Sequence, residues 1–282
     1  MAPLVSRRHF LGGAGCTAVI AASPRVGIPS APAAASVRDF DARSAMRFSA
    51  LPDVAPYGLK DATVVYAGEL WPKKANRSEP DLHYIAATAI PKLRRRAPDL
   101  LVLDVEHWDL AGIAPSEIKR NIDRYLSILT IFRQHIPRPQ LGLYGVLPVR
   151  SYWAPVRANP IEVTAWRREN QALQPIADAV DIVFPSLYTF YEDQGDWITY
   201  AKANMQEAKH YGKPVYPFLW PQYHNSRKAI SGDFWRVQLE TVFNNADGMV
   251  IWTPAKGKPR WDPNAPWWLE TVDFLEQAGL AG

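Results

Sequence analysis

Segments typical of strands alternate with segments typical of helices at least six times along the 282-residue chain, which predicts an α/β fold. Units of this kind pair their strands in parallel. No Gly-rich phosphate-binding loop follows any expected strand, so the sequence gives no support to an open dinucleotide-binding sheet. Most of these strands end instead in acidic or aromatic side chains. Because such ends meet at one rim of a closed sheet, we predict an imperfect TIM-like (β/α) barrel of seven or eight strands.

The expected strands are short apolar runs rich in β-branched and aromatic residues. They cover residues 62–68, 100–106, 140–146, 181–188, 213–220 and 247–252. Amphipathic segments between them predict helices over 81–96, 115–135, 160–179, 197–211, 233–244 and 267–278, with a break suggested by Pro175. Residues 36–60 contain prolines and show no clear period, so we expect them to be irregular.

The strand at 100–106 begins as a wholly apolar run and ends in two carboxylates, Asp104 and Glu106. Residues two apart in a strand point to the same face, so these two share a face, with Cα atoms roughly 6.5–7 Å apart. Acids in this position can cap a helix or pair with an arginine. They lose hydration unless water, a partner or a ligand meets them, and barrel enzymes place their chemistry at this end of a strand. The pair is therefore our candidate catalytic site.

Charge and composition narrow the class of function. Three of the cations that give the chain its formal charge of +4 lie in the first 35 residues, which contain no acid, so the rest of the chain carries +1. A nearly neutral protein is not a general nucleic-acid binder. Aromatic residues make up 12% of the chain, with 11 Trp, which fits carbohydrate stacking and also fits a large core.

The N-terminus is typical of an export signal. Ser6-Arg7-Arg8-His9-Phe10-Leu11 is a twin-arginine pattern, followed by a mildly apolar run and a small-residue cleavage site at 33–35. We predict that residues 1–35 are a twin-arginine signal that is removed, and that 36–282 form a single catalytic barrel domain, periplasmic or secreted. The apolar run is too short and Gly-rich for a stable membrane anchor, with lipid attachment at Cys16 as the alternative. Because Cys16 is the only cysteine, the mature chain can form no internal disulfide.

Several segments together resemble the hyaluronidase-type glycoside hydrolases of family 56. LVLDVEHW resembles the family's Asp-x-Glu strand, and VDIVFPSLY its Pro-Ser-x-Tyr strand end. PVYPFLWPQYH, DGMVIWTP and LGLYG resemble three further barrel strands, and order and spacing agree from about residue 60 to 255. The chain departs from the animal members in lacking disulfides and in being shorter. The chitinase-type family 18 signature D-x-x-D-x-D-x-E matches Asp99, Asp104 and Glu106, but its second acid falls on Val102.

The resemblance implies substrate-assisted, retaining hydrolysis of an N-acetylhexosamine-containing polysaccharide such as hyaluronan or chondroitin. Glu106 would be the acid/base and Asp104 would orient the 2-acetamido group. The residues alone support a proton donor here, because two neighbouring carboxyls tend to hold one proton and burial raises a carboxyl pKa. By the same resemblance Tyr188 would hydrogen-bond the acetamido oxygen, Tyr223 would line that subsite and Trp252 would form its floor.

Trp108 and Tyr144 are further candidates for substrate contact, with packing as the alternative for each aromatic residue. His107 points to the opposite face of the strand, which favours a structural role. Basic residues after strand ends could meet uronate carboxylates or form a solvated surface. They are Arg150, Arg227, Lys256, Lys258 and Arg260. No spacing suggests a metal site and no serine elbow is present, so we expect neither a metal nor a cofactor.

Two other functions stay open at this point. A non-catalytic carbohydrate-binding protein on a degenerate barrel would keep the aromatic residues but would not need the paired acids. A retaining glycosidase with a protein nucleophile would form a covalent adduct with its substrate. In each case the expected partner is a polysaccharide.

Overall fold

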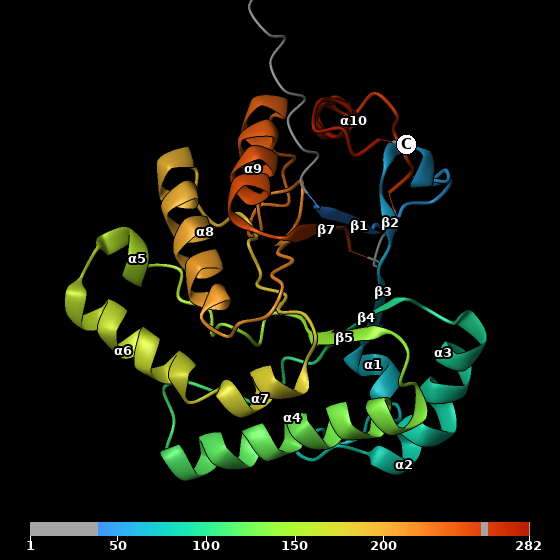
Figure 1. Cartoon of the computed structure of the whole chain (residues 1–282), viewed down its shortest axis with the longest axis vertical. Coiled ribbons are helices and arrows are strands. Elements are labelled where there is room, and N and C mark those ends of the chain that lie inside the picture. Colours follow the sequence, from blue (N-terminus) through green and yellow to red (C-terminus); the bar gives the residue numbers. More distant parts are fainter. Residues whose placement is uncertain (1–38, 255–258, 282) are drawn as a thin grey trace, which may run out of the picture. The chain divides into compact units, whose positions relative to one another are not determined.

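The computed structural model describes residues 39–254 and 259–281. The export signal predicted for residues 1–35 lies outside this part of the chain. Two sheets of parallel strands form the centre, with the helices outside them (Figure 1). The order β2–β1–β7–β6 joins Asp41–Ala45 (β1), Lys60–Asp61 (β2), Phe218–Leu219 (β6) and Gly248–Trp252 (β7). The order β3–β4–β5 joins Thr63–Tyr66 (β3), Leu100–Asp104 (β4) and Gln140–Leu143 (β5).

Backbone pairing joins the two sheets at both edges. On one side β2 runs into β3 with only Ala62 between them, and the two pair with β1 and β4 respectively. On the other side, segment 183–186 is bridged to Tyr144 after β5 and to residues 215 and 218 beside and within β6. Counting β2 and β3 as one strand and 183–186 as another, seven parallel segments of the described chain form a ring. The predicted TIM-like (β/α) fold is confirmed.

The helices lie between the strands along the chain, as predicted. Their bounds are α1 (Ala67–Leu70), α2 (Leu82–Tyr84), α3 (Ile90–Arg96), α4 (Pro115–His135), α5 (Ala154–Arg157), α6 (Pro160–Gln171), α7 (Gln174–Ala179), α8 (Gln194–Lys209), α9 (Gly232–Asn245) and α10 (Pro266–Gln277). A short 3-10 turn covers Ala55–Tyr57, and a π-helical turn, Ile85–Ala89, links α2 to α3. No helix in the described part is long and apolar enough to cross a bilayer.

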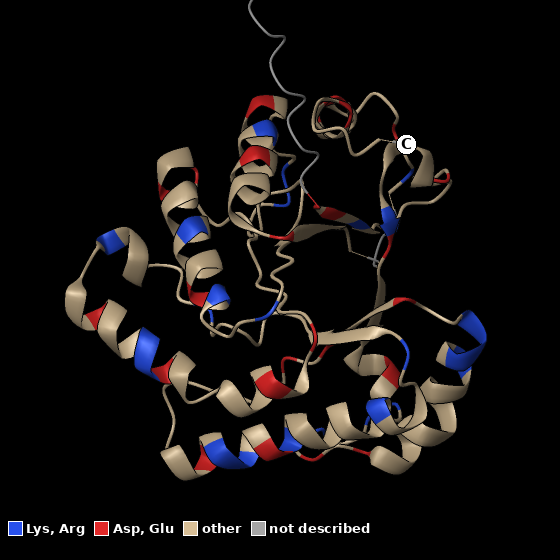
Figure 2. Cartoon of the chain, viewed as in Figure 1, with Lys and Arg blue, Asp and Glu red and all other residues tan. Residues whose placement is uncertain are grey.

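The fold has two cores. Side chains such as Val64, Val102 and Phe184 fill the interior of the ring. A larger core separates the strands from the helices and includes Leu103, Val105 and Leu129. The two faces of β4 therefore contribute to different cores, as the period of a strand requires. Charged residues lie mostly on the helices and loops, so acids on strands stand out (Figure 2).

Three expectations about elements need correction. Residues 41–45, expected to be irregular, form β1, whose Arg43 is buried because Asp41 and Asp99 neutralise it at 2.7 and 2.6 Å. The predicted strand at 181–188 makes only isolated bridges, and that at 213–220 is regular only at β6. The break in helix 160–179 falls just before α7, because a proline near the first turn begins a helix more readily than it interrupts one.

Candidate active site

Asp104 is the last residue of β4 and pairs in register with Tyr66 of β3, at the carboxyl end of the barrel strands. Its side chain is partly buried. Burial, as the larger cause, and the negative charge of Glu106 together raise the pKa of Asp104 to about 7, against the opposite effect of Arg150. This carboxyl therefore holds a proton close to neutral pH.

Glu106 lies just beyond β4, separated from Asp104 by the fully buried Val105. Its side chain is 37% exposed and forms an ion pair with the Arg150 guanidinium. Together with Tyr152 these two residues line a cavity of about 290 Å³. The two carboxyls thus differ sharply. Asp104 is partly buried and has a raised pKa, whereas Glu106 faces the cavity beside a cation. The sequence analysis predicted Glu106 as the proton donor, whereas the carboxyl whose pKa the structure raises is that of Asp104, because it is the deeper of the two.

Gly145 brings the chain close to Glu106. Its φ of +68° is in the left-handed region, and a Cβ built there would lie 3.3 Å from Glu106 Oε1. Its N–H donates to the Phe184 carbonyl at 2.9 Å, which fixes the loop after β5. A residue without a side chain is therefore required where the loop passes the carboxylate.

Three aromatic residues from separate strand ends gather near Asp104. Trp252 Nε1, at the end of β7, donates to the Tyr66 hydroxyl at 2.9 Å. The Trp252 ring stacks on Tyr188 with centroids 5.4 Å apart and an interplanar angle of 24°. Burial is the main cause that raises the pKa of both Tyr66 and Tyr188, and the negative charge of Asp104 contributes in each case. The structure thus brings together Asp104, Tyr188 and Trp252 from the predicted set and adds Tyr66.

Tyr144 lies in the interior core and supports this cluster. It is 5% exposed, its hydroxyl donates to Ser186 Oγ at 3.0 Å, and its ring packs against Phe218 and Tyr188 with centroids 4.8 and 5.8 Å away. Tyr144, which the sequence analysis offered for substrate contact, is thus a core residue that packs beneath the aromatic cluster.

The structure places Tyr223, predicted to line the acetamido subsite, outside this aromatic cluster, and brings its neighbour His224 into it. Tyr223 lines a separate cavity of about 350 Å³ with Phe190, and its ring packs 6.4 Å from Phe234. The His224 ring instead stacks against Tyr188 at 6.1 Å and Phe190 at 4.2 Å. Tyr223 is bridged to Thr189 in parallel, whereas His224 begins the turn that follows.

Trp108 is packed away from the carboxylates. It is 7% exposed, its indole N–H donates to the carbonyls of Arg77 and Ser78 at 3.1 Å, and its ring meets Tyr125 edge-on at 5.1 Å. This geometry gives Trp108 a structural role in the outer core. His107 also has partners outside the site, with Nε2 2.9 Å from an Arg77 guanidinium nitrogen.

The basic residues separate into different environments. Arg150 pairs with Glu106, and the Arg227 guanidinium lies 4.5 Å from the Trp220 ring centroid. Arg260 is exposed and its backbone is bridged to Ser49. Lys256 and Lys258 lie outside the described residues. Within residues 39–254 and 259–281, no group of three or more His, Cys, Asp or Glu side chains could hold a metal ion.

No family model matches the chain, and no curated protein is similar to it in sequence. Among solved structures it is similar to bee venom hyaluronidase, with 15% identity, a TM-score of 0.60, and coverage of 86% of this chain and 99% of that one. The chain has the fold of bee venom hyaluronidase. For the same enzyme in complex with a hyaluronic acid tetramer, identity is 15%, the TM-score 0.56 and the coverage 85% and 96%. A hyperthermophilic chitinase catalytic domain from Pyrococcus furiosus is also similar, at 13% identity, TM-score 0.49, and 80% and 76% coverage.

Proposed function

We propose that the chain is a glycoside hydrolase that cleaves an N-acetylhexosamine-containing polysaccharide, hyaluronan- or chondroitin-like, by a substrate-assisted retaining mechanism. The observation that carries this proposal is the pair of unlike carboxyls at the carboxyl end of β4, one partly buried with a raised pKa, the other open to a cavity. Two carboxyls whose environments separate their protonation states are suited to acid–base work. The shared barrel fold and the hyaluronic acid bound by the bee venom enzyme favour this class of substrate.

One proton shared by the pair supplies the acid. In the free protein Asp104 holds it while Arg150 faces Glu106. An acetamido N–H that donates to Asp104 favours its ionised form, so the proton passes to Glu106. Glu106 then protonates the glycosidic oxygen as the bond to the anomeric carbon breaks, and the acetamido oxygen bonds to that carbon. Glu106 next takes a proton from the water that opens the cyclic intermediate, and the protein supplies no nucleophile.

The aromatic residues hold the reacting sugar. Trp252 provides a flat apolar surface of the kind that sugar rings stack on, and its N–H already fixes Tyr66. Tyr188 is the proposed hydrogen-bond donor to the acetamido oxygen. Arg150 positions Glu106 and stabilises its ionised form after proton transfer.

Removing the acetamido group tests the mechanism. We expect new reducing ends to form from an N-acetylated oligosaccharide and at least about 100-fold more slowly from the same oligosaccharide after N-deacetylation, because the intramolecular nucleophile is lost and well-oriented intramolecular groups reach effective concentrations of about 10⁵–10⁸ M. Equal rates on the two substrates would disprove substrate assistance. A covalent glycosyl adduct in the mass spectrum of the working enzyme would favour a protein nucleophile instead.

We also propose that residues 1–35 direct export through the twin-arginine route. Arg7 and Arg8 are the residues that such a route reads. A double substitution, Arg7→Lys with Arg8→Lys, should leave the uncleaved precursor in the cytoplasm. Processing and export unchanged by that substitution would contradict the proposal.

A further inference from the structure

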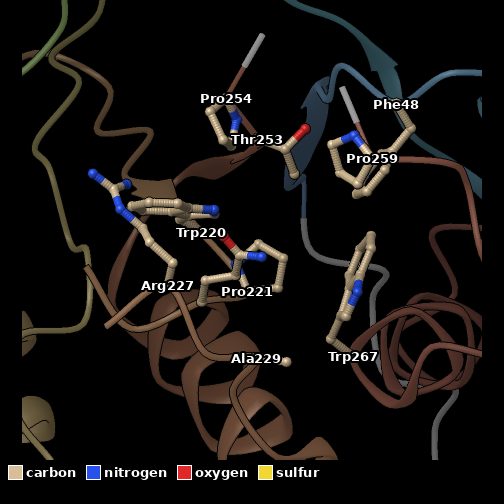
Figure 3. A pocket seen from close by; sticks show the side chains of 10 residues that line it. Phe48, Trp220, Pro221, Arg227, Ala229, Thr253, Pro254, Pro259 and Trp267 are labelled. Carbon is tan, nitrogen blue, oxygen red and sulfur yellow. The ribbon is translucent and has the colours of Figure 1, made fainter. Parts of the chain in front are cut away.

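A further hollow, with a volume of about 490 Å³, lies beside the aromatic cluster of Tyr66, Tyr188 and Trp252 (Figure 3). The side chains that line it include Phe48, Trp220, Gln222, Arg227, Thr253 and Trp267. Phe48, Trp220 and Thr253 follow the carboxyl ends of β1, β6 and β7, so the hollow lies on the rim that carries Asp104. Trp220 also meets Trp252 edge-on, with ring centroids 5.3 Å apart. The hollow is therefore next to the candidate active site and distinct from the cavity that holds Glu106.

Trp220 presents an unused hydrogen-bond donor here. The residue is 1% exposed, and within the described part of the chain its Nε1 has no acceptor. Figure 3 shows this nitrogen at the end of the indole that faces the hollow. Buried polar groups in native proteins are nearly always paired, so an unpaired buried N–H that faces a hollow points to an acceptor supplied by a ligand.

Arg227 gives the hollow its charge. It is the only charged residue among the lining side chains, all of which the structure describes. Its guanidinium covers the Trp220 ring at 4.5 Å. The Arg227 backbone has a φ of +61°, in the left-handed region. Two contacts hold it there: the Arg227 N–H donates a hydrogen bond to the Tyr223 carbonyl at 2.9 Å, and Gln222 is bridged to Ala229 across the same hairpin. A non-glycine residue kept in this conformation is held there by its surroundings.

The opposite wall is aromatic. Phe48 and Trp267 stack with centroids 5.9 Å apart and an angle of 13° between the rings. The hollow thus combines an apolar wall, the unpaired indole N–H of Trp220 and one cation, with no acid among its lining residues to repel an anion. These are the features that recognise a sugar ring with an acidic substituent.

We propose that this hollow is a distal sugar subsite, which binds a hexose ring bearing a carboxylate or sulfate group of the same polysaccharide chain that Asp104 and Glu106 cleave. The inference rests on the proposed function. A ring hydroxyl accepts from Trp220 Nε1, the anionic group pairs with Arg227, and the apolar face of the ring packs on the Phe48 and Trp267 wall. Oligosaccharides long enough to reach from the reacting sugar to this hollow therefore bind more tightly than shorter ones.

Binding to the Glu106→Gln protein tests the subsite without turnover. The probes are hyaluronan oligosaccharides of increasing length, a chondroitin sulfate oligosaccharide and neutral chitin oligosaccharides of equal length, measured by calorimetry. Two variants are added to this background. Trp220→Phe keeps a ring and removes the N–H, and Arg227→Gln removes the charge. Arg138→Gln is the matched control, since Arg138 is exposed and precedes β5 at the opposite rim.

We expect Trp220→Phe to weaken binding of the longer oligosaccharides about fivefold to tenfold, whether charged or neutral, because one hydrogen bond is lost. Arg227→Gln should weaken only the acidic probes by a similar factor, and the probe that loses more affinity identifies carboxylate or sulfate as the anionic group. Arg138→Gln should stay within twofold of the parent. Unchanged affinity in both test variants at every length would overturn the subsite, as would the absence of binding by all probes.

A reducing-end assay with the wild-type protein separates this proposal from the function on which it rests. Hydrolysis of the long probes, with affinities that neither variant changes, removes the subsite alone. Length-dependent binding that both variants weaken, without any hydrolysis, keeps the subsite and removes the proposed enzyme activity. Thermal melting of each variant checks that the fold is intact.

Discussion

At the scale of single residues, the account depends on the proton held by Asp104. Burial and the Glu106 charge raise its pKa to about 7, and Arg150 acts in the opposite direction. A ¹³C NMR titration of the Asp104 carboxyl should therefore have a midpoint close to 7. Glu106→Gln should lower that midpoint and Arg150→Gln should raise it. A midpoint near the usual value of about 4 in all three proteins would show that Asp104 is not a proton store.

The same residue makes stability depend on pH. The folded-state pKa of Asp104 is about 7 and its value in the unfolded chain is about 3.9, so the unfolded chain loses this proton first as pH rises. The wild type therefore loses stability between about pH 4 and 7. Asp104→Asn removes this loss and should stabilise the protein at pH 8 by about 2 kcal/mol, discounted from about 4 kcal/mol because the side chain is only partly buried.

Urea unfolding of wild type and Asp104→Asn at pH 4 and pH 8 measures this difference, while the variant's hydrolysis rate should fall severely. If Asp104→Asn were no more stable than wild type at pH 8, the burial of the Asp104 charge would have no energetic consequence. A gain in stability that accompanies a loss of activity is typical of a functional residue.

The sequence identified the two acids but not their partners. Asp104 and Glu106 are recognisable because they interrupt an apolar strand. Arg150 lies 44 residues away and reaches Glu106 only through the loop after β5. Tyr66 could have been found from the register between neighbouring strands, but that register depends on pairing that the sequence does not specify. Which carboxyl keeps the proton follows from depth, and this too is a tertiary property.

At the scale of elements, the connection after β5 sets the position of the carboxylate. Gly145→Ala puts a Cβ into a left-handed backbone and 3.3 Å from Glu106 Oε1. The backbone term costs about 1–2 kcal/mol of stability. Displacement of Glu106 should lower kcat at least tenfold, because a misplaced catalytic group loses rate steeply.

Gly212→Ala is the matched control for this prediction. Gly212 has a φ of +67° and nothing within 4 Å of an added Cβ, so Gly212→Ala has the same backbone cost in stability but creates no new contact. Urea unfolding and initial rates should show similar losses of stability in the two variants and a loss of kcat in Gly145→Ala alone. Equal kcat values would mean that the loop does not position Glu106.

β1 is a strand that the sequence analysis did not predict. Its sequence, Asp41-Ala42-Arg43-Ser44-Ala45, lacks the large apolar residues by which strands are recognised, yet Arg43 is 5% exposed. Arg43→Leu leaves Asp41, which is itself largely buried, without its closest cation. We expect a loss of about 3–5 kcal/mol in the free energy of unfolding, as for other broken buried pairs.

Lys60→Gln removes the exposed partner of the same Asp41, 3.0 Å away, and serves as the control, with an expected loss below about 1 kcal/mol. Urea denaturation measures both. A loss for Arg43→Leu as small as that for Lys60→Gln would mean that the Arg43 ion pairs do not hold β1 in the barrel.

At the scale of the whole molecule, the two ends of the barrel carry different groups of residues. The end where β1 starts carries the ion pairs of Arg43. The end where β4 and β7 finish carries Asp104 and Trp252, the cavity beside Glu106 and the hollow beside Trp220. The alternation of strands and helices was enough to predict this barrel and the rim at which Asp104 lies. The count of seven could not be fixed, because β2 and β3 share one strand and segment 183–186 pairs only through bridges.

The most direct test of the account is the release of reducing ends by residues 36–282 from hyaluronan, chondroitin, chitin oligosaccharides and peptidoglycan. We predict that the wild type cleaves at least one of these N-acetylhexosamine polymers, and that Glu106→Gln, with an unchanged melting temperature, cleaves it at least about 100-fold more slowly. No cleavage of any polymer by the wild type, or equal cleavage by both proteins, would contradict the assignment of this barrel as a glycosidase.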